Sequence, residues 1–150
     1  MKAYAEINVK APKEAIWSVI CDIEHCDHNI SGIQKVEVLE QPDSGVVGLK
    51  WRETRTMFGK EATEVMWITE AEEYSYYKTR AESHGSIYIS RMGIIEQGDH
   101  CVLSMGFEGV ALTFGAKIGN AIFSKMMAKS TEKALFVDLE DIKKVVLNQG

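Results

Sequence analysis

Two charged residues in a predicted β-strand could do acid–base chemistry or orient a ligand. Because side chains alternate along a strand, one face of the predicted strand 47–57 carries Leu49, Trp51, Glu53, Arg55 and Met57. The apolar ends of this set predict that the face is turned inward, so Glu53 and Arg55 would point into the protein. Ionised groups are not left unpaired in a core, and we expect these two to pair with each other or with a neighbour.

Two more charged residues extend this pattern onto the following strands. Glu64 lies on the next predicted strand, and Arg80 lies on the one after it, in line with Tyr74, Tyr76 and Lys78. Two interpretations remain open. The residues form a polar cluster that orients a ligand or acts as general acid and base, or they form a charge network that only fills space under a helix. A wrong assignment of the strand faces would also remove the cluster.

Residues 21–28, Cys-Asp-Ile-Glu-His-Cys-Asp-His, are the one stretch with the side chains of a metal site. The stretch lacks the paired C-x-x-C spacing of structural zinc sites, and no second group of Cys or His follows it. Neither Cys21 nor Cys26 has the surroundings of a catalytic nucleophile. The glycines at 45 and 48 lead into a strand and lack the spacing of a phosphate loop. The sequence therefore predicts no metal and no cofactor.

The elements that must position the charged residues are predicted from periodicity and turn residues. Alternation predicts a strand over residues 2–9, and Pro12 starts a helix that a second short helix follows at 24–28. Six further strands are predicted at 33–40, 47–57, 61–70, 74–83, 86–96 and 101–110. Their short connections indicate antiparallel neighbours. With a long final helix over about 113–147, the order is β-α-α-β6-α, an α+β fold.

The long helix is predicted to form one wall of a cavity. Leu135, Leu139, Ile142 and Val146 recur at helical spacing on one stripe. Extended backward, the stripe reaches Glu132, Ala128, Lys125, Ala121 and Phe114. Most of these are small or polar where a packed core would have Leu or Ile, so they leave room.

A second group on the helix falls off this stripe, and its role stays open. The group consists of Ile122, Phe123, Met126 and Met127. It would form a ligand entrance, a homodimer surface or a patch that touches a membrane, or it would be ordinary core if the helix bends near Gly119.

Composition narrows the class of protein. The 150 residues predict one domain over 1–150, and 45% hydrophobic with 26% charged residues are ordinary globular values. A net charge of −5 argues against a nucleic-acid partner, which usually meets a basic surface. No apolar run approaches the roughly 20 residues that span a bilayer, so stable membrane insertion is not expected. The odd number of cysteines (three) suits the cytoplasm.

The chain resembles the START-like (SRPBCC) superfamily over its whole length. The resemblance rests on residues 11–17 (Ala-Pro-Lys-Glu-Ala-Ile-Trp) with the following Asp22, and on residues 48–61 (GLKWRETRTMFGKE). The resemblance implies a helix-grip fold, in which a seven-stranded antiparallel sheet wraps around the last helix and leaves an apolar cavity. Members of the superfamily bind lipids, polyketides, sterols, quinones or hormones, and some catalyse cyclisation or dehydration.

The leading hypothesis is a binder of a hydrophobic small molecule such as a lipid, a quinone or a polyketide-like aromatic. The predicted ligand-binding residues are Trp51, Glu53, Arg55, Glu64, Tyr74, Tyr76, Arg80, Phe107, Ala121 and Lys125. One alternative is an enzyme like the polyketide cyclases, with Glu53 or Glu64 as base and Arg55 or Arg80 stabilising an enolate. Another is an interaction module that uses the Met/Phe group of the long helix. Whether the chain is an enzyme is left open.

Overall fold

The computed structural model describes residues 2–57, 59–83, 85–111 and 114–149, and the side chains of 57, 111 and 114–127 lie outside the description. In chain order the elements are β1 (Lys2–Val9), α1 (Lys13–Ile20), the 3-10 turn η1 (Ile23–His25), α2 (Cys26–Asn29), β2 (Ile33–Glu40), β3 (Lys50–Met57), β4 (Lys60–Glu72), β5 (Tyr76–Ser83), β6 (Ser86–Gln97), β7 (His100–Ala111) and α3 (Phe114–Asn148). The predicted α+β order and the long final helix are confirmed.

Two strands begin later than the sequence predicts, and backbone conformation explains both delays. Gly45 and Gly48 have φ of 68° and 94°, a left-handed conformation that breaks extended pairing, so β3 starts at Lys50. Tyr74 has φ of 64° and lies in the turn before β5, which therefore begins at Tyr76.

All seven strands form one antiparallel sheet in the order β1-β7-β6-β5-β4-β3-β2. Strands β2 to β7 are successive hairpins, whereas β1 pairs with β7 along its whole length, from Lys2 opposite Glu108 to Val9 opposite Cys101. The first two strands therefore occupy opposite edges of the sheet. The segment that contains α1, η1 and α2 connects these edges.

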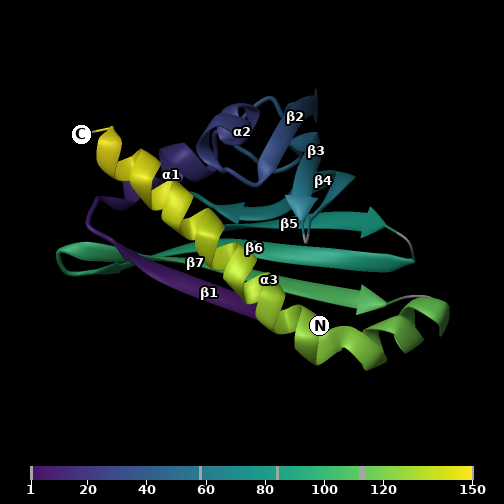
Figure 1. The fold of residues 1–150 in the computed structure, drawn as a ribbon. Helices are drawn as coiled ribbons and strands as arrows, with labels where there is room; N and C mark the ends of the chain where they lie inside the picture. The colour runs from purple at the N-terminus through teal and green to yellow at the C-terminus, as the bar shows by residue number, and fades with distance from the viewer. Residues whose placement is uncertain (1, 58, 84, 112–113, 150) are drawn as a thin grey trace.

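Helix α3 crosses one face of the sheet and ends beside α1 (Figure 1). Its C-terminal half buries Leu135, Leu139, Ile142 and Val146, as the stripe predicts. Leu139, Ile142 and Val146 join a core that includes Ile16 and Ile20 of α1 together with sheet residues such as Leu103. The long helix is thus held at its C-terminal half by the sheet and by α1.

The backward extension of the stripe is partly wrong. Glu132 is exposed, and the buried position one turn before Leu135 is Thr131. Because a helix advances 100° per residue, the residue four positions before Leu135 lies closer to its face than the residue three positions before it. Thr131 is therefore buried and Glu132 is not. The side chains of Phe114, Ala121 and Lys125, and of the Met/Phe group at 122, 123, 126 and 127, lie outside the described residues. Over the described ranges, no helix has the length and apolar character needed to cross a membrane.

Candidate functional site

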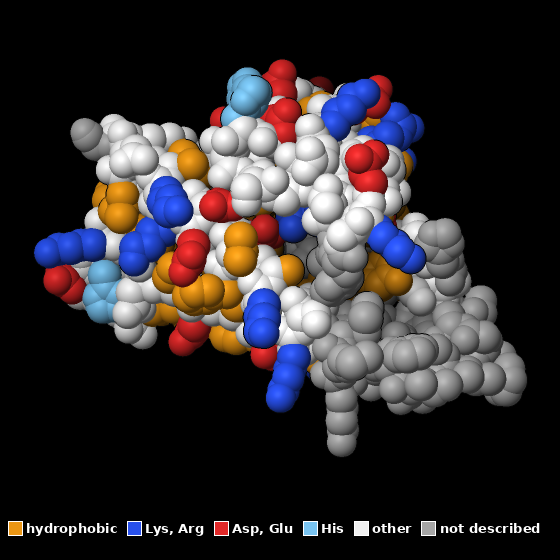
Figure 2. Space-filling view, viewed as in Figure 1, with side chains coloured by type: hydrophobic (Ala, Val, Ile, Leu, Met, Phe, Trp, Pro, Cys, Tyr) orange, Lys and Arg blue, Asp and Glu red, His pale blue; other side chains and the backbone are white. Residues whose placement is uncertain are grey.

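A cavity of about 340 Å³ lies between the inner face of the sheet, the short helices and α3. Its lining comes from α1, η1, α2, β2 to β7 and the second half of α3 and is mainly apolar, with Ile20, Trp51, Met66, Phe107 and Leu135 among the contributors. Its volume is at the low end of the range for small-molecule sites. On the outer surface of the α3 side, acidic and basic side chains are interspersed (Figure 2).

Three charged side chains in the cavity wall form one connected cluster. Arg55 Nη1 donates to Asp138 Oδ1 at 3.2 Å, and Arg55 Nη2 lies 2.9 Å from Asp138 Oδ2. On the other side, Arg55 Nε donates to Glu53 Oε2 at 3.4 Å, and Trp51 Nε1 donates to Glu53 Oε1 at 3.3 Å. The paired carboxylate and guanidinium groups hold β3 against α3 in a two-point geometry that Lys could not supply.

Burial and pairing shift the pKa of Arg55, and that of Asp138, in opposite directions. Burial lowers the pKa of Arg55, but the neighbouring Asp138 and Glu53 outweigh it, so the pKa ends above its ordinary value. For Asp138, which is only 3% exposed, burial raises the pKa and Arg55 opposes that rise only in part. Arg55 therefore stays charged, and Asp138 depends on it to remain ionised.

The loop after α2 packs against this cluster. The backbone N–H and the hydroxyl of Ser31 both donate to Asp141 Oδ2 of α3, at 3.0 and 2.7 Å. A Cβ on the next residue, Gly32, would lie 3.4 Å from Arg55 Nη1 and 4.0 Å from Asp138 Oδ1. The Gly32 carbonyl accepts a hydrogen bond from the N–H of Thr56 at 3.0 Å, which connects the loop to β3. The loop thus covers the charged cluster and joins it to the helix.

Strands β5 and β6 contribute small and polar side chains to the cavity. Thr79 and Ser90 lie on these paired strands, and their hydroxyls hydrogen-bond to each other. The buried Tyr77 hydroxyl donates to the Ile20 carbonyl at the end of α1, at 2.9 Å. These three hydroxyls therefore make their hydrogen bonds within the wall.

Of the eight predicted ligand-binding residues whose side chains the structure describes, five line the cavity. These are Trp51, Glu53, Arg55, Glu64 and Phe107. Glu64 lies directly opposite Glu53 on the paired strands β3 and β4. Whether these residues bind a ligand stays a prediction, but the inward direction of the Glu53 and Arg55 face is right.

The placement of Tyr74, Tyr76 and Arg80 in the cavity is wrong. On β5 the cavity is lined by Tyr77, Thr79 and Ala81, so the alternate positions 76, 78 and 80 face the other side of the sheet. There Tyr76 packs under the guanidinium of Arg91, with 4.5 Å between Arg91 Cζ and the ring centre. Arg80 pairs with Glu82 at 2.7 Å. Arg80 is therefore not available to stabilise an enolate in the cavity.

Several cavity residues were not predicted, and Asp138 is the most important of them. Its position three residues after Leu135 on the buried stripe was a usable signal, because an acid in such a stripe needs a cationic partner. Cys26, Thr79, Ser90 and Thr131 also line the cavity. Ser and Thr are mostly exposed in proteins, and a single Cys does not distinguish a cavity wall from packed core, so these residues gave no signal.

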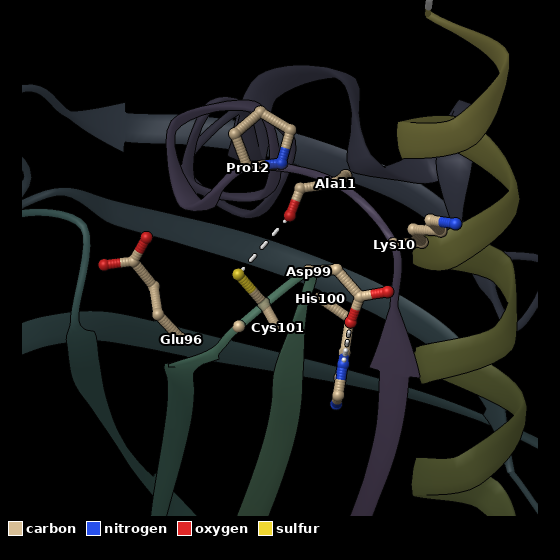
Figure 3. A pocket seen from close by; sticks show the side chains of 8 residues that line it. Lys10, Ala11, Pro12, Glu96, Asp99, His100 and Cys101 are labelled. Carbon is tan, nitrogen blue, oxygen red and sulfur yellow. Dashed lines mark hydrogen bonds and ion pairs between the residues drawn. The ribbon is translucent and has the colours of Figure 1, made fainter.

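A second hollow lies where the β6–β7 hairpin meets the residues before α1. It is an open cleft of about 380 Å³ (Figure 3). Cys101 Sγ donates to the Ala11 carbonyl at 3.4 Å, and His100 Nδ1 lies 3.0 Å from Asp99 Oδ1. These contacts join sequence neighbours or fix the strand end, and the cleft has no converging polar groups among the described residues. Throughout the described ranges, no three His, Cys, Asp or Glu side chains gather in a way that could hold a metal ion.

Comparison with solved structures identifies the fold. The protein TTHA0849 from Thermus thermophilus is similar with a TM-score of 0.81 and 14% identity, over 100% of this chain and 99% of that one. The Zhui aromatase/cyclase from Streptomyces sp. R1128 is similar with a TM-score of 0.77 and 15% identity, over 99% and 94%. A START superfamily protein from Mycobacterium smegmatis is similar with a TM-score of 0.64 and 18% identity, over 89% and 96%.

The chain therefore has a START-like helix-grip fold, as its sequence predicts. No family model matches the sequence, and no curated protein matches it. The TM-scores establish the architecture, whereas identities this low do not carry a function over, so the function must be argued from the cavity itself.

Proposed function

We propose that the protein binds a hydrophobic small molecule in the cavity between the sheet and α3. The observation that carries this proposal is the contrast within the wall, where a mostly apolar lining contains one charged cluster that is already paired. Apolar lining gives affinity for a hydrophobic body, while a few fixed polar groups set its orientation. A cavity of about 340 Å³ suits a compact molecule of one to a few rings better than a long lipid chain.

A neutral fluorescent probe, N-phenyl-1-naphthylamine, tests whether the cavity accepts such a molecule. The probe should bind in a 1:1 ratio with increased emission. Ala81 is buried in the cavity wall, and Ala81→Leu should weaken binding by about tenfold or more, because the larger side chain occupies ligand space. Ala71→Leu is the matched control, since Ala71 is a half-buried alanine of the same sheet that does not line the cavity. Equal affinities for both variants would contradict the proposal.

Native mass spectrometry of the protein purified from cells would identify its natural ligand. We expect a stoichiometric adduct that denaturation releases as a small hydrophobic molecule. Loss of this adduct in Ala81→Leu, but not in Ala71→Leu, would place it in the cavity. An adduct that both variants retain equally would have to bind elsewhere.

An enzyme that moves protons is the second candidate, and the carboxylates favour it. Glu53 and Glu64 lie on paired positions of neighbouring strands in the cavity wall, and Arg55 contacts the first of them. This arrangement offers a base and a fixed positive charge near one ligand. If the released molecule is converted by the wild-type protein, Glu53→Gln should abolish conversion and retain most of the affinity. Parallel losses of both would indicate a binding role only.

A further inference from the structure

Two hydroxyl side chains in the middle of the sheet face the cavity as a pair. Thr79 of β5 and Ser90 of β6 lie at directly opposed positions, both line the cavity, and their hydroxyls hydrogen-bond to each other. Thr79 is only 7% exposed. The neighbours of the pair in the same row across the sheet are apolar, with Ile68 opposite Thr79 and Phe107 opposite Ser90. The pair is therefore a polar point in apolar surroundings.

The hydrogen bond within the pair uses only one of its two hydrogens. Each hydroxyl carries one hydrogen, and a single hydrogen lies between the two oxygens, whichever of them donates. Within the part of the chain that the structure describes, neither hydroxyl makes a second hydrogen bond. The remaining hydrogen must therefore be accepted by water or by a ligand. A ligand that displaced the water without accepting this hydrogen would leave a buried donor unpaired, which weakens binding.

Two aromatic rings lie beside the hydroxyl pair. Tyr88 is two residues before Ser90 on the same face of β6, and its ring stacks on that of Phe107, with 5.7 Å between the ring centres and 20° between the planes. Both rings line the cavity, and Ala81, opposite Tyr88 and two residues after Thr79, adds only a methyl group beside them. Positions two apart on a strand are separated by about 6.6 Å. A flat ring against the aromatic stack would therefore place an oxygen attached to it at the hydroxyls.

We propose that Thr79 and Ser90 form a subsite for a carbonyl oxygen, and that the ligand of this cavity is a compact aromatic ketone or aldehyde. This inference rests on the proposed binding function and specifies the polar group that the ligand carries. A carbonyl oxygen accepts the remaining hydrogen and brings no hydrogen of its own that would need a partner among the apolar neighbours. The aromatic body of the ligand packs against Tyr88 and Phe107.

Two ligands of the same shape test the proposal: 2-acetylnaphthalene and 2-isopropenylnaphthalene, in which a CH₂ group replaces the carbonyl oxygen. Displacement of N-phenyl-1-naphthylamine measures the affinity of each. Thr79→Val/Ser90→Ala removes both hydroxyls and should lower the affinity ratio of ketone to hydrocarbon by about tenfold or more. Replacement of both partners of a hydrogen bond by apolar groups is close to neutral for stability, so the variant should fold. An unchanged ratio would overturn the carbonyl subsite and leave the binding function intact.

A second pair of opposed hydroxyls in the same sheet supplies the matched control. Thr54 and Thr63 lie opposite each other on β3 and β4, their hydroxyl oxygens are 2.9 Å apart, and neither residue lines the cavity. Thr54→Val/Thr63→Ala should leave the affinity ratio of ketone to hydrocarbon unchanged. An equal fall of the ratio in both double variants would overturn the proposed position of the carbonyl oxygen.

The vibration of the bound carbonyl group gives a second readout, on the wild-type protein. Infrared difference spectra of 2-acetylnaphthalene with a carbon-13 carbonyl should show the C=O band at lower frequency in the complex than in hexane, because a hydrogen bond weakens the C=O bond. A band at the hexane position would overturn the proposal whether or not the double variant folds. Binding of the fluorescent probe without displacement by the ketone would also overturn this inference alone. If neither the probe nor either ligand binds to folded wild-type protein, the binding function itself fails and this inference with it.

Discussion

Arg55 on β3 and Asp138 on α3 are joined by a two-point ion pair with distances of 3.2 and 2.9 Å, although they lie 83 residues apart in the sequence. The pair connects the inner face of the sheet to the long helix beside the cavity. Because the acid is almost completely buried, the pair constrains where the helix lies on the sheet.

Removal of the arginine should destabilise the fold strongly. Arg55→Met leaves Asp138 buried without its cation, and we expect a loss of about 3–5 kcal/mol in the free energy of unfolding, measured by urea denaturation. The control is Arg52→Met, which breaks an exposed pair with Glu37 at 2.8 Å and should cost at most about 1 kcal/mol. Similar losses in the two variants would contradict a structural role for the buried pair. The double variant Arg55→Met/Asp138→Leu should recover much of the loss, because it removes both charges.

Asp138 should also make stability depend on pH. Burial raises its pKa in the folded protein above the ordinary value of 3.8, so folding favours the protonated acid. Its stabilising contribution is complete below pH 3.8 and is lost as the pH rises through the raised folded value. The stability of the wild type relative to Asp138→Asn should therefore fall from about pH 4 upward, as followed by urea denaturation at several pH values. Glu140→Gln, at an exposed position of the same helix, should show no such trend. A constant difference for Asp138→Asn would contradict the assignment.

Two adjacent tyrosines should respond differently to loss of their hydroxyls. Tyr77→Phe removes the buried hydrogen bond to the Ile20 carbonyl, and we expect a loss of about 1 kcal/mol. Tyr76→Phe keeps the ring under Arg91 and should change stability by less than about 0.5 kcal/mol. Thermal and urea unfolding of both variants would measure this difference. Equal effects would mean that the bond between β5 and α1 adds nothing to stability.

The cysteines beside the cavity should react slowly with alkylating reagents. Burial raises the pKa of both Cys21 and Cys26 to about 12, and the thiolate is the reactive form. At about pH 8, iodoacetamide should modify them on the order of a thousandfold more slowly than cysteines with an ordinary pKa near 8.5. Peptide mass spectrometry over time, with urea-unfolded protein as the reference, would measure the rates. Rapid labelling of Cys26 in the folded protein would contradict its burial.

The fold could be predicted because the patterns that determine it are local. Turn glycines separate strands with clear alternation, and Leu49 and Trp51 mark the inward face that carries Glu53 and Arg55. On β5 the same reasoning failed. The inward positions hold the uncharged Tyr77, Thr79 and Ala81, but the prediction followed the aromatic rings of Tyr74 and Tyr76 and so placed Arg80 on the wrong face.

The failure on β5 has a physical cause that concerns the cavity itself. Space is left where inward side chains are small, as at Ala81 and Ser90, and small side chains give the weakest pattern. The charged cluster was predicted only in part, with Glu53 and Arg55 but without Asp138, for a different reason. The partner of Arg55 is on α3, and no local rule indicates which residue of a distant helix will meet a given strand position.

The pairing of β1 with β7 has a consequence for how the protein is made. The first strand emerges from the ribosome at once, but its partner is complete only when residues 100–111 have been synthesised. Until then β1 exposes unsatisfied backbone groups, while β2 to β7 can form successive local hairpins. Contacts between distant segments slow folding and prolong the time in which an unpaired strand edge can aggregate. Closure of the sheet by its N-terminal strand is therefore a late event, and nascent chains that stop before residue 100 would be prime substrates for chaperones.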